Sequence, residues 1–311
     1  MEKPLLSICC STYNQVKYIE YALEGFIKQK VSFPIEIIVH DDASTDGTSD
    51  ILLKYSSKYA NIIPVIQKEN LMSKGMNPTI DFCLCKARGK YIALCDGDDY
   101  WTDPYKLQKQ VDFLESKHEF SLCATRYDEL DERKSSSEEN EIFIKLFEDK
   151  RPLIEVTLDN FMSPYVIMTL TVVFRRENLD LGALRLPYFK DNFLWGILLL
   201  KGKGACLNFK SAVYRKHSDG IYSSLKKIER ELFEYKTASA MKKYFGERSR
   251  TVIEYYVCTS WRLFLEIDKN KFRNLNKFYL YLKLYIKCKI YWRFKRYMYV
   301  IKSLYSPEHN Q

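Results

Sequence analysis

The chain has 311 residues, of which 46% are hydrophobic and 29% are charged, a composition that is typical of a globular protein and excludes an intrinsically disordered one. The formal net charge of +9 belongs to one end of the sequence. Residues 269–311 hold eleven Lys or Arg against a single acidic residue, Glu308, so residues 1–268 sum to about −1. No apolar stretch reaches the ~18 residues of a membrane-spanning helix, and the first apolar run is too short for a signal peptide. The nine cysteines lie mostly inside apolar runs, as reduced thiols do, and we therefore expect a cytoplasmic protein.

The first 120 residues alternate between apolar runs and segments with helical spacing. The apolar runs predict strands at 5–10, 35–39, 62–66 and 90–95. The segments between and after them predict helices capped by Asn14, over 49–59, over 78–87 and starting at Asp103-Pro104. This alternation predicts an α/β fold with a mostly parallel sheet flanked by helices.

The second half of the chain has weaker patterns. The Ser- and charge-rich segment 131–141 predicts a surface loop, and the alternating residues 165–176 predict a strand. A helix over 191–200 and a strand over 205–214 follow, and the pattern from about residue 225 onward is helical. We therefore expect an α/β domain over residues 1–222 and a basic, aromatic-rich helical region over 223–311.

Polar residues directly follow three of the predicted strands. They are Ser11 to Asn14, Asp41 to Asp46, and Asp96 to Asp99. Because ligands bind beyond the carboxyl ends of the strands in open α/β sheets, we expect these segments to meet in one crevice. The last segment places three carboxylates within four residues, and a hard divalent ion such as Mn²⁺ or Mg²⁺ would offset their repulsion. The sequence therefore predicts a metal site and a phosphorylated substrate, with a solvated acidic turn as the alternative.

Several motifs occur in a specific order and spacing. They are Leu5 to Asn14, Gln29, Glu36 to Thr48, Ala87 to Ile92, and Asp96 to Asp99. Over roughly residues 4–220 the chain resembles glycosyltransferase family 2, the inverting nucleotide-sugar transferases with the Rossmann-like GT-A fold. Three positions depart from the usual family pattern, Cys10-Ser11, His40 and Ala43, and none of these departures removes a charged group.

The resemblance implies a role for each residue of the donor site. Asp98 and Asp99 would hold the metal and the donor diphosphate, and Asp96 the ribose. Asp42 would bind the base edge, which is most simply uracil, although guanine and thymine fit the same contacts. The remaining implied donor contacts are Tyr13, which would stack on the base, and Ser11, Thr12, Asn14, Asp41 and Asn77. The alternative is a turn residue for Asp41 and a core aromatic for Tyr13.

The resemblance also implies a base and two residues near the diphosphate. Asp191 would take the proton of the acceptor hydroxyl as its oxygen attacks the sugar carbon from the side opposite the leaving group. An aspartate favoured by the helix dipole is the alternative for this position. Arg215 and His217 match a downstream family element and would close over the diphosphate or a phosphorylated acceptor, while an ordinary histidine is the alternative for His217.

The expected function is a metal-dependent transfer of a sugar from a nucleoside diphosphate, most simply UDP, to a glycan or lipid-linked hydroxyl in bacterial surface polysaccharide synthesis. The basic, aromatic segment 269–307 would dock on the anionic inner face of the plasma membrane. A helical cap packed on the core is the alternative, and nucleic-acid binding is a third reading that we disfavour. Two rival functions are a sugar nucleotidyltransferase and a non-catalytic nucleotide-binding subunit of a glycan assembly complex. The nucleotidyltransferase fits less well because no glycine-rich basic loop follows the first strand. The non-catalytic subunit fits less well because it predicts missing carboxylates, whereas all four are present: Asp42, Asp98, Asp99 and Asp191.

Overall fold

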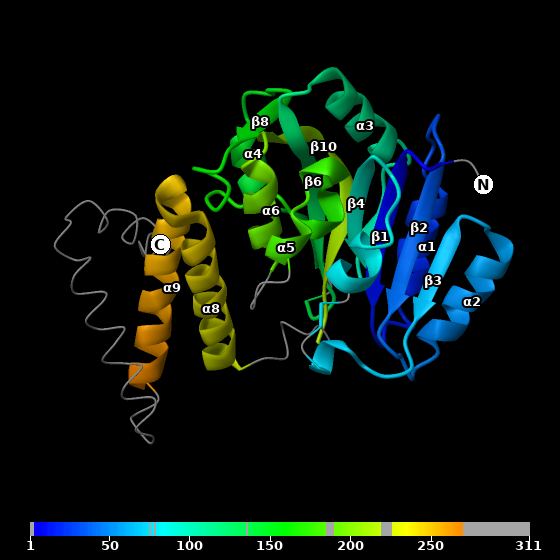
Figure 1. The fold of residues 1–311 in the computed structure, drawn as a ribbon, viewed down its shortest axis with the longest axis horizontal. Coiled ribbons are helices and arrows are strands. Elements are labelled where there is room, and N and C mark those ends of the chain that lie inside the picture. Colours follow the sequence, from blue (N-terminus) through cyan, green and yellow to red (C-terminus); the bar gives the residue numbers. More distant parts are fainter. Residues whose placement is uncertain are drawn as a thin grey trace. The chain divides into compact units, whose positions relative to one another are not determined.

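The computed structural model describes residues 3–74, 76–77, 79–134, 136–184, 190–218 and 226–269. These residues form two units: residues up to 184 with 191–218 make up the first, and Lys190 with 226–269 the second. Figure 1 shows the elements of both. The boundary expected between residues 222 and 223 falls outside the described residues.

The first unit is built on a sheet. Among the described residues ten strands pair in the order β3-β2-β1-β4-β9-β6-β10-β5, with β7 paired to β6 and β8 paired to β10. The strands are β1 (Leu6–Thr12), β2 (Ile35–Asp41), β3 (Ile62–Ile66), β4 (Tyr91–Asp96), β5 (Tyr100–Trp101), β6 (Phe120–Asp131), β7 (Ser136–Glu139), β8 (Leu153–Val156), β9 (Val173–Arg175) and β10 (Lys203–Lys216).

The first four strands run parallel, as the alternation of strands and helices predicted. β1 lies between β2 and β4, with Ser11 opposite His40 on one side and Asp96 on the other. The rest of the sheet is mixed, because β9 is antiparallel to β4 and β6, while β10 is parallel to β6 and antiparallel to β5 and β8. The carboxyl ends of β1, β2 and β4 therefore lie side by side (Figure 1).

The helices of the first unit follow the predicted apolar spacing. They are α1 (Ile19–Ile27), α2 (Thr48–Lys58), α3 (Lys106–Ser116), α4 (Glu141–Leu146), α5 (Leu181–Leu184) and α6 (Asp191–Leu199). In α1 the residues Ile19, Leu23 and Phe26 are buried at helical spacing. Short 3₁₀ turns lie at η1 (Met72–Lys74), η3 (Thr169–Thr171) and η4 (Arg176–Asn178).

Two helix predictions differ from the structure. Asn14 does not cap the first helix: α1 begins at Ile19, and the Asn14 side chain instead accepts a hydrogen bond from the Thr45 N–H at 2.9 Å. Asn14 has a φ of 51°, which is a left-handed conformation that Asn tolerates in turns. The helix expected over 78–87 is a π-helix, η2 (Thr79–Leu84).

Two predictions in the second half also differ. The predicted loop 131–141 contains β7, which pairs with β6 as an edge strand, where polar composition is common. Of the predicted strand 165–176, only β9 forms. Before it, the Leu170 carbonyl accepts a hydrogen bond from Trp101 Nε1 at 2.7 Å, and the Thr171 carbonyl accepts one from Gln110 Nε2 at 2.9 Å. These side chains take the acceptors that a strand partner would need.

The second unit contains two helices, α8 (Lys227–Phe245) and α9 (Arg250–Lys269), joined by the 3₁₀ turn η5 (Gly246–Arg248). They pack through a small buried cluster of Tyr235, Ala238, Tyr256 and Leu263. Ion pairs between Glu231 and Arg262 and between Lys227 and Glu266 also link α8 to α9. Among the helices that the structure describes, none combines the length and the apolar character needed to cross a membrane. The basic segment 269–307 lies outside the described residues, apart from Lys269 at the end of α9.

Candidate functional site

The three polar segments meet at one edge of the sheet. The register of β1 pairs Thr12 with Asp41 on β2 and Ser11 with Asp96 on β4. The Gly97 N–H donates to the Ser11 carbonyl at 2.9 Å, and the Asp42 N–H donates to the Thr12 carbonyl at 3.1 Å. The loops after β2 and β4 are therefore both tied to the end of β1.

In the Ser11 to Asn14 segment, Tyr13 and Asn14 are exposed. The Tyr13 ring is 39% exposed, so Tyr13 is not a core aromatic. Its neighbours are held by the protein: the Ser11 and Thr79 hydroxyls lie 2.5 Å apart, and Thr12 Oγ1 donates to Gln15 Oε1 at 2.7 Å. A base that stacks on Tyr13 would therefore rest on a fixed turn.

The two aspartates at the end of β2 hold different loops. Asp41 is fully buried and accepts hydrogen bonds from the Ser44 and Ser49 hydroxyls, which fixes the turn before α2. Asp42 is 2% exposed. Its Oδ1 accepts from the Leu71 N–H at 2.8 Å and its Oδ2 from the Met72 N–H at 3.1 Å, so this carboxylate holds the chain that leads into η1. Further along that loop, the Asn77 N–H donates to Asp81 Oδ2 at 2.9 Å.

The carboxylates after β4 have unequal surroundings. Asp99 is 2% exposed and its Oδ1 accepts from the Arg215 N–H at 2.9 Å, so its side chain is directed into the protein. Asp98 is partly exposed, and its Oδ2 lies 3.1 Å from His217 Nε2. Burial raises the pKa of Asp96 to about 7, and the charges of Asp98 and Asp191 add to this rise. Burial also raises the pKa of Asp99 well above its usual range.

The residues present fit a divalent cation in part. Among the described residues no three His, Cys, Asp or Glu side chains converge on one point. The carboxylate–imidazole pair Asp98–His217 offers an oxygen and a nitrogen, 3.1 Å apart. Mn²⁺ and Mg²⁺ commonly take only one or two protein ligands and complete their shell with phosphate oxygens and water. The geometry thus favours Asp98 with His217 as the protein ligands over the predicted pair Asp98 with Asp99.

Asp191 is the first residue of α6. Its charge raises the pKa of Asp96, which places the two carboxylates near one another. Its Oδ1 accepts from the Asn192 N–H at 2.8 Å, and its Oδ2 accepts long hydrogen bonds from the Tyr165 hydroxyl at 3.3 Å and the Thr169 hydroxyl at 3.4 Å. The aspartate is thus both a helix-start residue and a carboxylate facing the site.

Arg215 is 8% exposed and is held by several groups. Its Nε donates to the Asp98 carbonyl at 3.0 Å, and its Nη1 donates to Glu132 at 2.5 Å. Three tyrosine rings surround the guanidinium, those of Tyr18, Tyr21 and Tyr100, at 4.8, 5.1 and 5.3 Å. Glu132 and these tyrosines were not predicted, because Glu132 lies in a segment whose composition indicated a loop.

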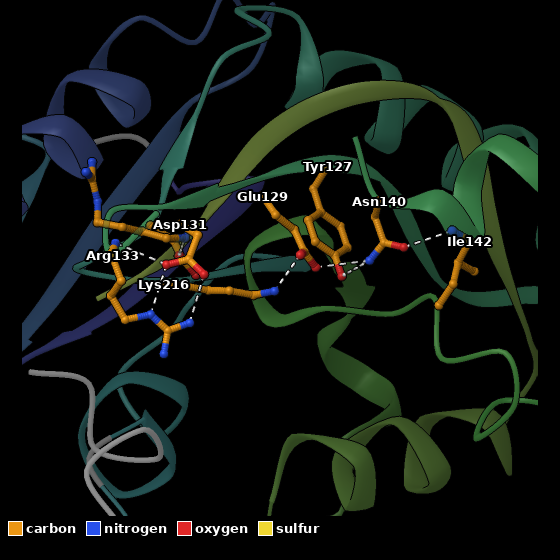
Figure 2. A network of polar contacts seen from close by, with 9 residues as sticks. Tyr127, Glu129, Asp131, Arg133, Asn140, Ile142 and Lys216 are labelled. Carbon is orange, nitrogen blue, oxygen red and sulfur yellow. Dashed lines mark hydrogen bonds and ion pairs between the residues drawn. The ribbon is translucent and has the colours of Figure 1, made fainter. Parts of the chain in front are cut away.

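The end of β10 is also anchored by a neighbouring network, shown in Figure 2. Lys216 Nζ donates to Glu129 Oε2 at 2.5 Å. Asn140 caps α4 and donates through Nδ2 to Glu129 Oε1 at 3.1 Å and to the Tyr127 hydroxyl at 3.2 Å. Because side chains alternate along a strand, Lys216 and Arg215 anchor opposite faces of β10 to the end of β6.

Known proteins with similar sequences support the resemblance. Putative teichuronic acid biosynthesis glycosyltransferase TuaG of Bacillus subtilis is 32% identical over 71% of this chain and 83% of its own length. UDP-Glc:alpha-D-GlcNAc-diphosphoundecaprenol beta-1,3-glucosyltransferase WfaP of Escherichia coli is 30% identical over 70% and 79%. An uncharacterized protein of Mycobacterium tuberculosis is 35% identical over 74% of this chain, which spans 64% of the length of that relative.

Solved structures share the fold. TarS 1–349 of S. aureus, in complex with UDP-GlcNAc, superposes with a TM-score of 0.65 at 21% identity, over 90% of this chain and 79% of that one. The mannosyltransferase PcManGT of Pyrobaculum calidifontis, in complex with GDP-Man and Mn²⁺, gives a TM-score of 0.57 at 17% identity, over 99% and 89%. The mixed sheet flanked by helices is therefore the GT-A fold that the sequence predicted.

The family match covers more than half of the chain and includes the carboxylates after β2 and β4. The sequence model described as "Glycosyl transferase family 2" matches residues 7–176. This chain is therefore a member of glycosyl transferase family 2.

Proposed function

We propose that the protein transfers a sugar from a nucleoside-diphosphate donor to a hydroxyl of a glycan or lipid-linked acceptor, with inversion at the sugar carbon and with the help of Mn²⁺ or Mg²⁺. The observation that carries this proposal is the Asp98–His217 pair at 3.1 Å, set beside Asp96 and near Asp191 at the carboxyl edge of β1, β2 and β4. A ligand pair for the diphosphate and a separate carboxylate for the acceptor are the two parts that such a transfer needs.

The donor end of the site is built for a nucleotide. Tyr13 offers an exposed ring for stacking, and Asp42 fixes the chain at Leu71 and Met72 beside the expected base position. The solved relatives bind UDP-GlcNAc, UDP or GDP-Man, so both uracil and guanine nucleotides occur among them. We propose a UDP-sugar, because a single carboxylate beside a stacking ring suits the uracil imide.

At the diphosphate end, Asp98 and His217 would hold the divalent cation, which supplies positive charge where the leaving oxygen becomes negative. Asp191 acts on the acceptor side. Its carboxylate takes the proton from the attacking hydroxyl, while the hydrogen bonds from Tyr165 and Thr169 keep it aimed at the site. No enzyme-bound sugar intermediate is needed, because the hydroxyl oxygen forms the new bond as the diphosphate leaves.

The names of two relatives support a proposal for the acceptor class. WfaP is named for glucosyl transfer to GlcNAc-diphosphoundecaprenol, and TuaG for teichuronic acid biosynthesis. We therefore propose a polysaccharide or lipid-linked acceptor made at the cytoplasmic side of a bacterial membrane. The basic segment 269–307 would bring the enzyme to that surface.

A screen of sugar nucleotides tests the proposal. The full-length protein with Mn²⁺ should release the nucleoside diphosphate slowly from its donor by hydrolysis, and one sugar nucleotide should stand out from UDP-Glc, UDP-GlcNAc, UDP-Gal and GDP-Man. Release of pyrophosphate from a nucleoside triphosphate and a sugar phosphate would instead identify a nucleotidyltransferase. Nucleotide binding without turnover of any donor, even with lipid-linked acceptors present, would favour a non-catalytic subunit.

A further inference from the structure

Arg215 forms three hydrogen bonds with other residues of the protein. The backbone N–H binds the Asp99 carboxylate at 2.9 Å, Nε binds the Asp98 carbonyl at 3.0 Å, and Nη1 binds Glu132 at 2.5 Å. Arg215 of β10 thus forms hydrogen bonds with Asp98 and Asp99, two successive residues of the loop after β4. The sequence pattern suggested a contact from Arg215 to the donor, but these contacts favour a different role.

Glu132 connects Arg215 to the other half of the proposed metal pair. Besides Arg215, it accepts a hydrogen bond from the Tyr18 hydroxyl at 3.0 Å. The Tyr18 ring packs on the His217 ring, with the ring centres 4.6 Å apart. Glu132 therefore reaches Asp98 through Arg215 and His217 through Tyr18.

The surroundings of this cluster make it rigid. The Arg215 side chain is 7% exposed, and three tyrosine rings enclose its guanidinium. A guanidinium removed from water needs a charged partner and cation–π contacts to remain there, and Glu132 with the tyrosines provides both. A planar group bound at two edges has one orientation, so the Asp98 carbonyl is held in one place.

We propose that Glu132 and Arg215 are positioning residues that hold Asp98 and His217 at the separation needed to bind the metal of the donor complex, and that Arg215 does not contact the donor. This inference rests on the proposed function, because it concerns how the same metal site is preorganised. Groups that orient metal ligands commonly change metal affinity by ~10- to 100-fold when they are altered.

The neighbouring ion pair Glu129–Lys216 provides a matched control. It links β10 to Glu129 of β6 at the same 2.5 Å separation (Figure 2), three residues before Glu132, which directly follows β6. Glu129 also accepts a hydrogen bond from Asn140, which donates in turn to the Tyr127 hydroxyl, so the described network of this pair leads away from Asp98. Glu129→Gln therefore measures how far Mn²⁺ affinity changes when a nearby ion pair is lost that does not hold the proposed metal ligands.

The test uses full-length protein and the variants Glu132→Gln, Arg215→Lys, both together, and Glu129→Gln. Mn²⁺ is titrated calorimetrically at saturating UDP, with GDP in parallel, and UDP is also titrated in EDTA. We expect the apparent Mn²⁺ Kd to rise ~10-fold or more in Glu132→Gln and Arg215→Lys and less than about twofold in Glu129→Gln. The apparent Mn²⁺ Kd of the double variant should be no higher than that of the single variant with the higher Kd, because the two residues act as one unit.

Three results would overturn the inference. If the wild type shows no Mn²⁺-dependent binding of UDP or GDP, both this inference and the proposed function fail. If the wild type binds but Glu132→Gln and Arg215→Lys bind Mn²⁺ as it does, only the positioning role fails. If Arg215→Lys weakens UDP equally with Mn²⁺ and in EDTA, Arg215 contacts the nucleotide. Glu132→Gln keeps the side-chain volume at a partly exposed position, so it remains informative if Arg215→Lys does not fold.

Discussion

Asp98 carries more of the proposed chemistry than its neighbours, although the three aspartates stand together in the sequence. Asp99 is committed to the Arg215 N–H, and Asp96 sits where burial and like charge raise its pKa to about 7. Of the three, Asp98 combines partial exposure with a histidine nitrogen at 3.1 Å. We therefore propose Asp98, with His217 beside it, as the residue that would hold a cation at this edge.

Asp98→Asn should abolish the Mn²⁺-dependent part of UDP binding. The amide keeps the size of the side chain but has no charge to offer the cation, and Mn²⁺ prefers anionic oxygen. Isothermal titration with and without Mn²⁺ measures the loss. Asp50→Asn, at an exposed position in the first turn of α2, is the control and should bind as the wild type does. Unchanged Mn²⁺-dependent affinity in Asp98→Asn would refute the metal assignment.

Asp191→Asn should slow sugar transfer and leave UDP binding nearly unchanged. An asparagine at the start of α6 still accepts the hydrogen bond that Asp191 Oδ1 receives from the Asn192 N–H, so α6 should stay in place. It cannot accept a proton, and the transfer rate should fall by ~10² or more. UDP affinity should remain within about twofold of the wild type. Normal turnover with the best donor found in the screen would exclude Asp191 as the base.

At the scale of elements, α3 begins with a buried lysine. Lys106 is fully buried, donates to Gln110 Oε1 at 2.7 Å and lies 4.3 Å from the centre of the Trp101 ring. Burial lowers the pKa of Lys106 to about 7. Between about pH 7 and the ordinary lysine value near 10, the unfolded chain holds a proton at this site that the folded chain lacks, so this residue's contribution to stability rises with pH.

Lys106→Met should remove that contribution. From pH 7 to pH 9, the free energy of unfolding of the wild type should rise relative to that of Lys106→Met by roughly 2 kcal/mol. Urea unfolding of both proteins at the two pH values measures the difference. Lys109→Met, on an exposed part of the same helix, should show the same pH dependence as the wild type. Parallel pH profiles for wild type and Lys106→Met would mean that Lys106 is not neutral in the fold.

The contact between β1 and the turn before β4 depends on a glycine. A Cβ on Gly89 would lie 2.6 Å from the Ser7 nitrogen and 2.7 Å from the Leu6 carbonyl carbon, both backbone atoms that cannot move aside alone. Gly89→Ala should lower the free energy of unfolding by about 1–3 kcal/mol, as overpacking commonly does. Gly182→Ala in α5, whose closest contact would be one side-chain oxygen at 3.3 Å, should change it by less than about 1 kcal/mol. Thermal unfolding compares the two variants, and equal melting temperatures would contradict this reading.

An element could be predicted where the sequence pattern that specifies it lies within the element itself. The parallel half follows from apolar runs and helical spacing such as Ile19, Leu23 and Phe26, because each signal lies within one element. The segment before β9 has the alternation of a strand but does not form one, because Trp101 and Gln110, 69 and 61 residues away in the chain, donate hydrogen bonds to its carbonyls. No periodicity in residues 165–172 reports such partners.

The residues of the candidate site also differ in whether a local sequence signal marks them. Ser11, Asp41 and Asp96 were predicted to lie close together because they stand at the ends of strands, and the parallel pairing of β1 with β2 and β4 does bring these ends together. Glu132 was missed because its importance comes from Arg215, 83 residues further along, and its own segment looks like a polar loop. A charged residue just after a strand is no signal by itself, and only the pairing of β6 with β10 places it beside the arginine.

At the scale of the whole molecule, the charge is strongly uneven. Residues 1–268 sum to about −1, whereas 269–311 carry about +10. The proposed nucleotide site would have to attract a cation, whereas a basic segment close to it would repel one. The carboxylates of that site and the basic segment are separated along the chain. Any attraction of the protein to an anionic surface is therefore expected to come from the basic segment 269–307.

Binding of the full-length chain to lipid vesicles should therefore follow the terminal charges. Each basic residue near an anionic leaflet contributes ~1 kcal/mol, so changing Lys283, Lys287 and Lys289 together to Gln should lower partitioning onto phosphatidylglycerol vesicles by roughly 10²-fold in co-sedimentation at 0.1 M salt. The same triple change at Lys54, Lys58 and Lys68, exposed in the first unit, should have little effect. Because the attraction is electrostatic, 0.5 M salt should weaken binding of the wild type, and neutral phosphatidylcholine vesicles should weaken it at least as much as the triple change does. Equal binding of both triple variants, or binding that ignores vesicle charge, would mean that the basic segment serves something other than an anionic surface.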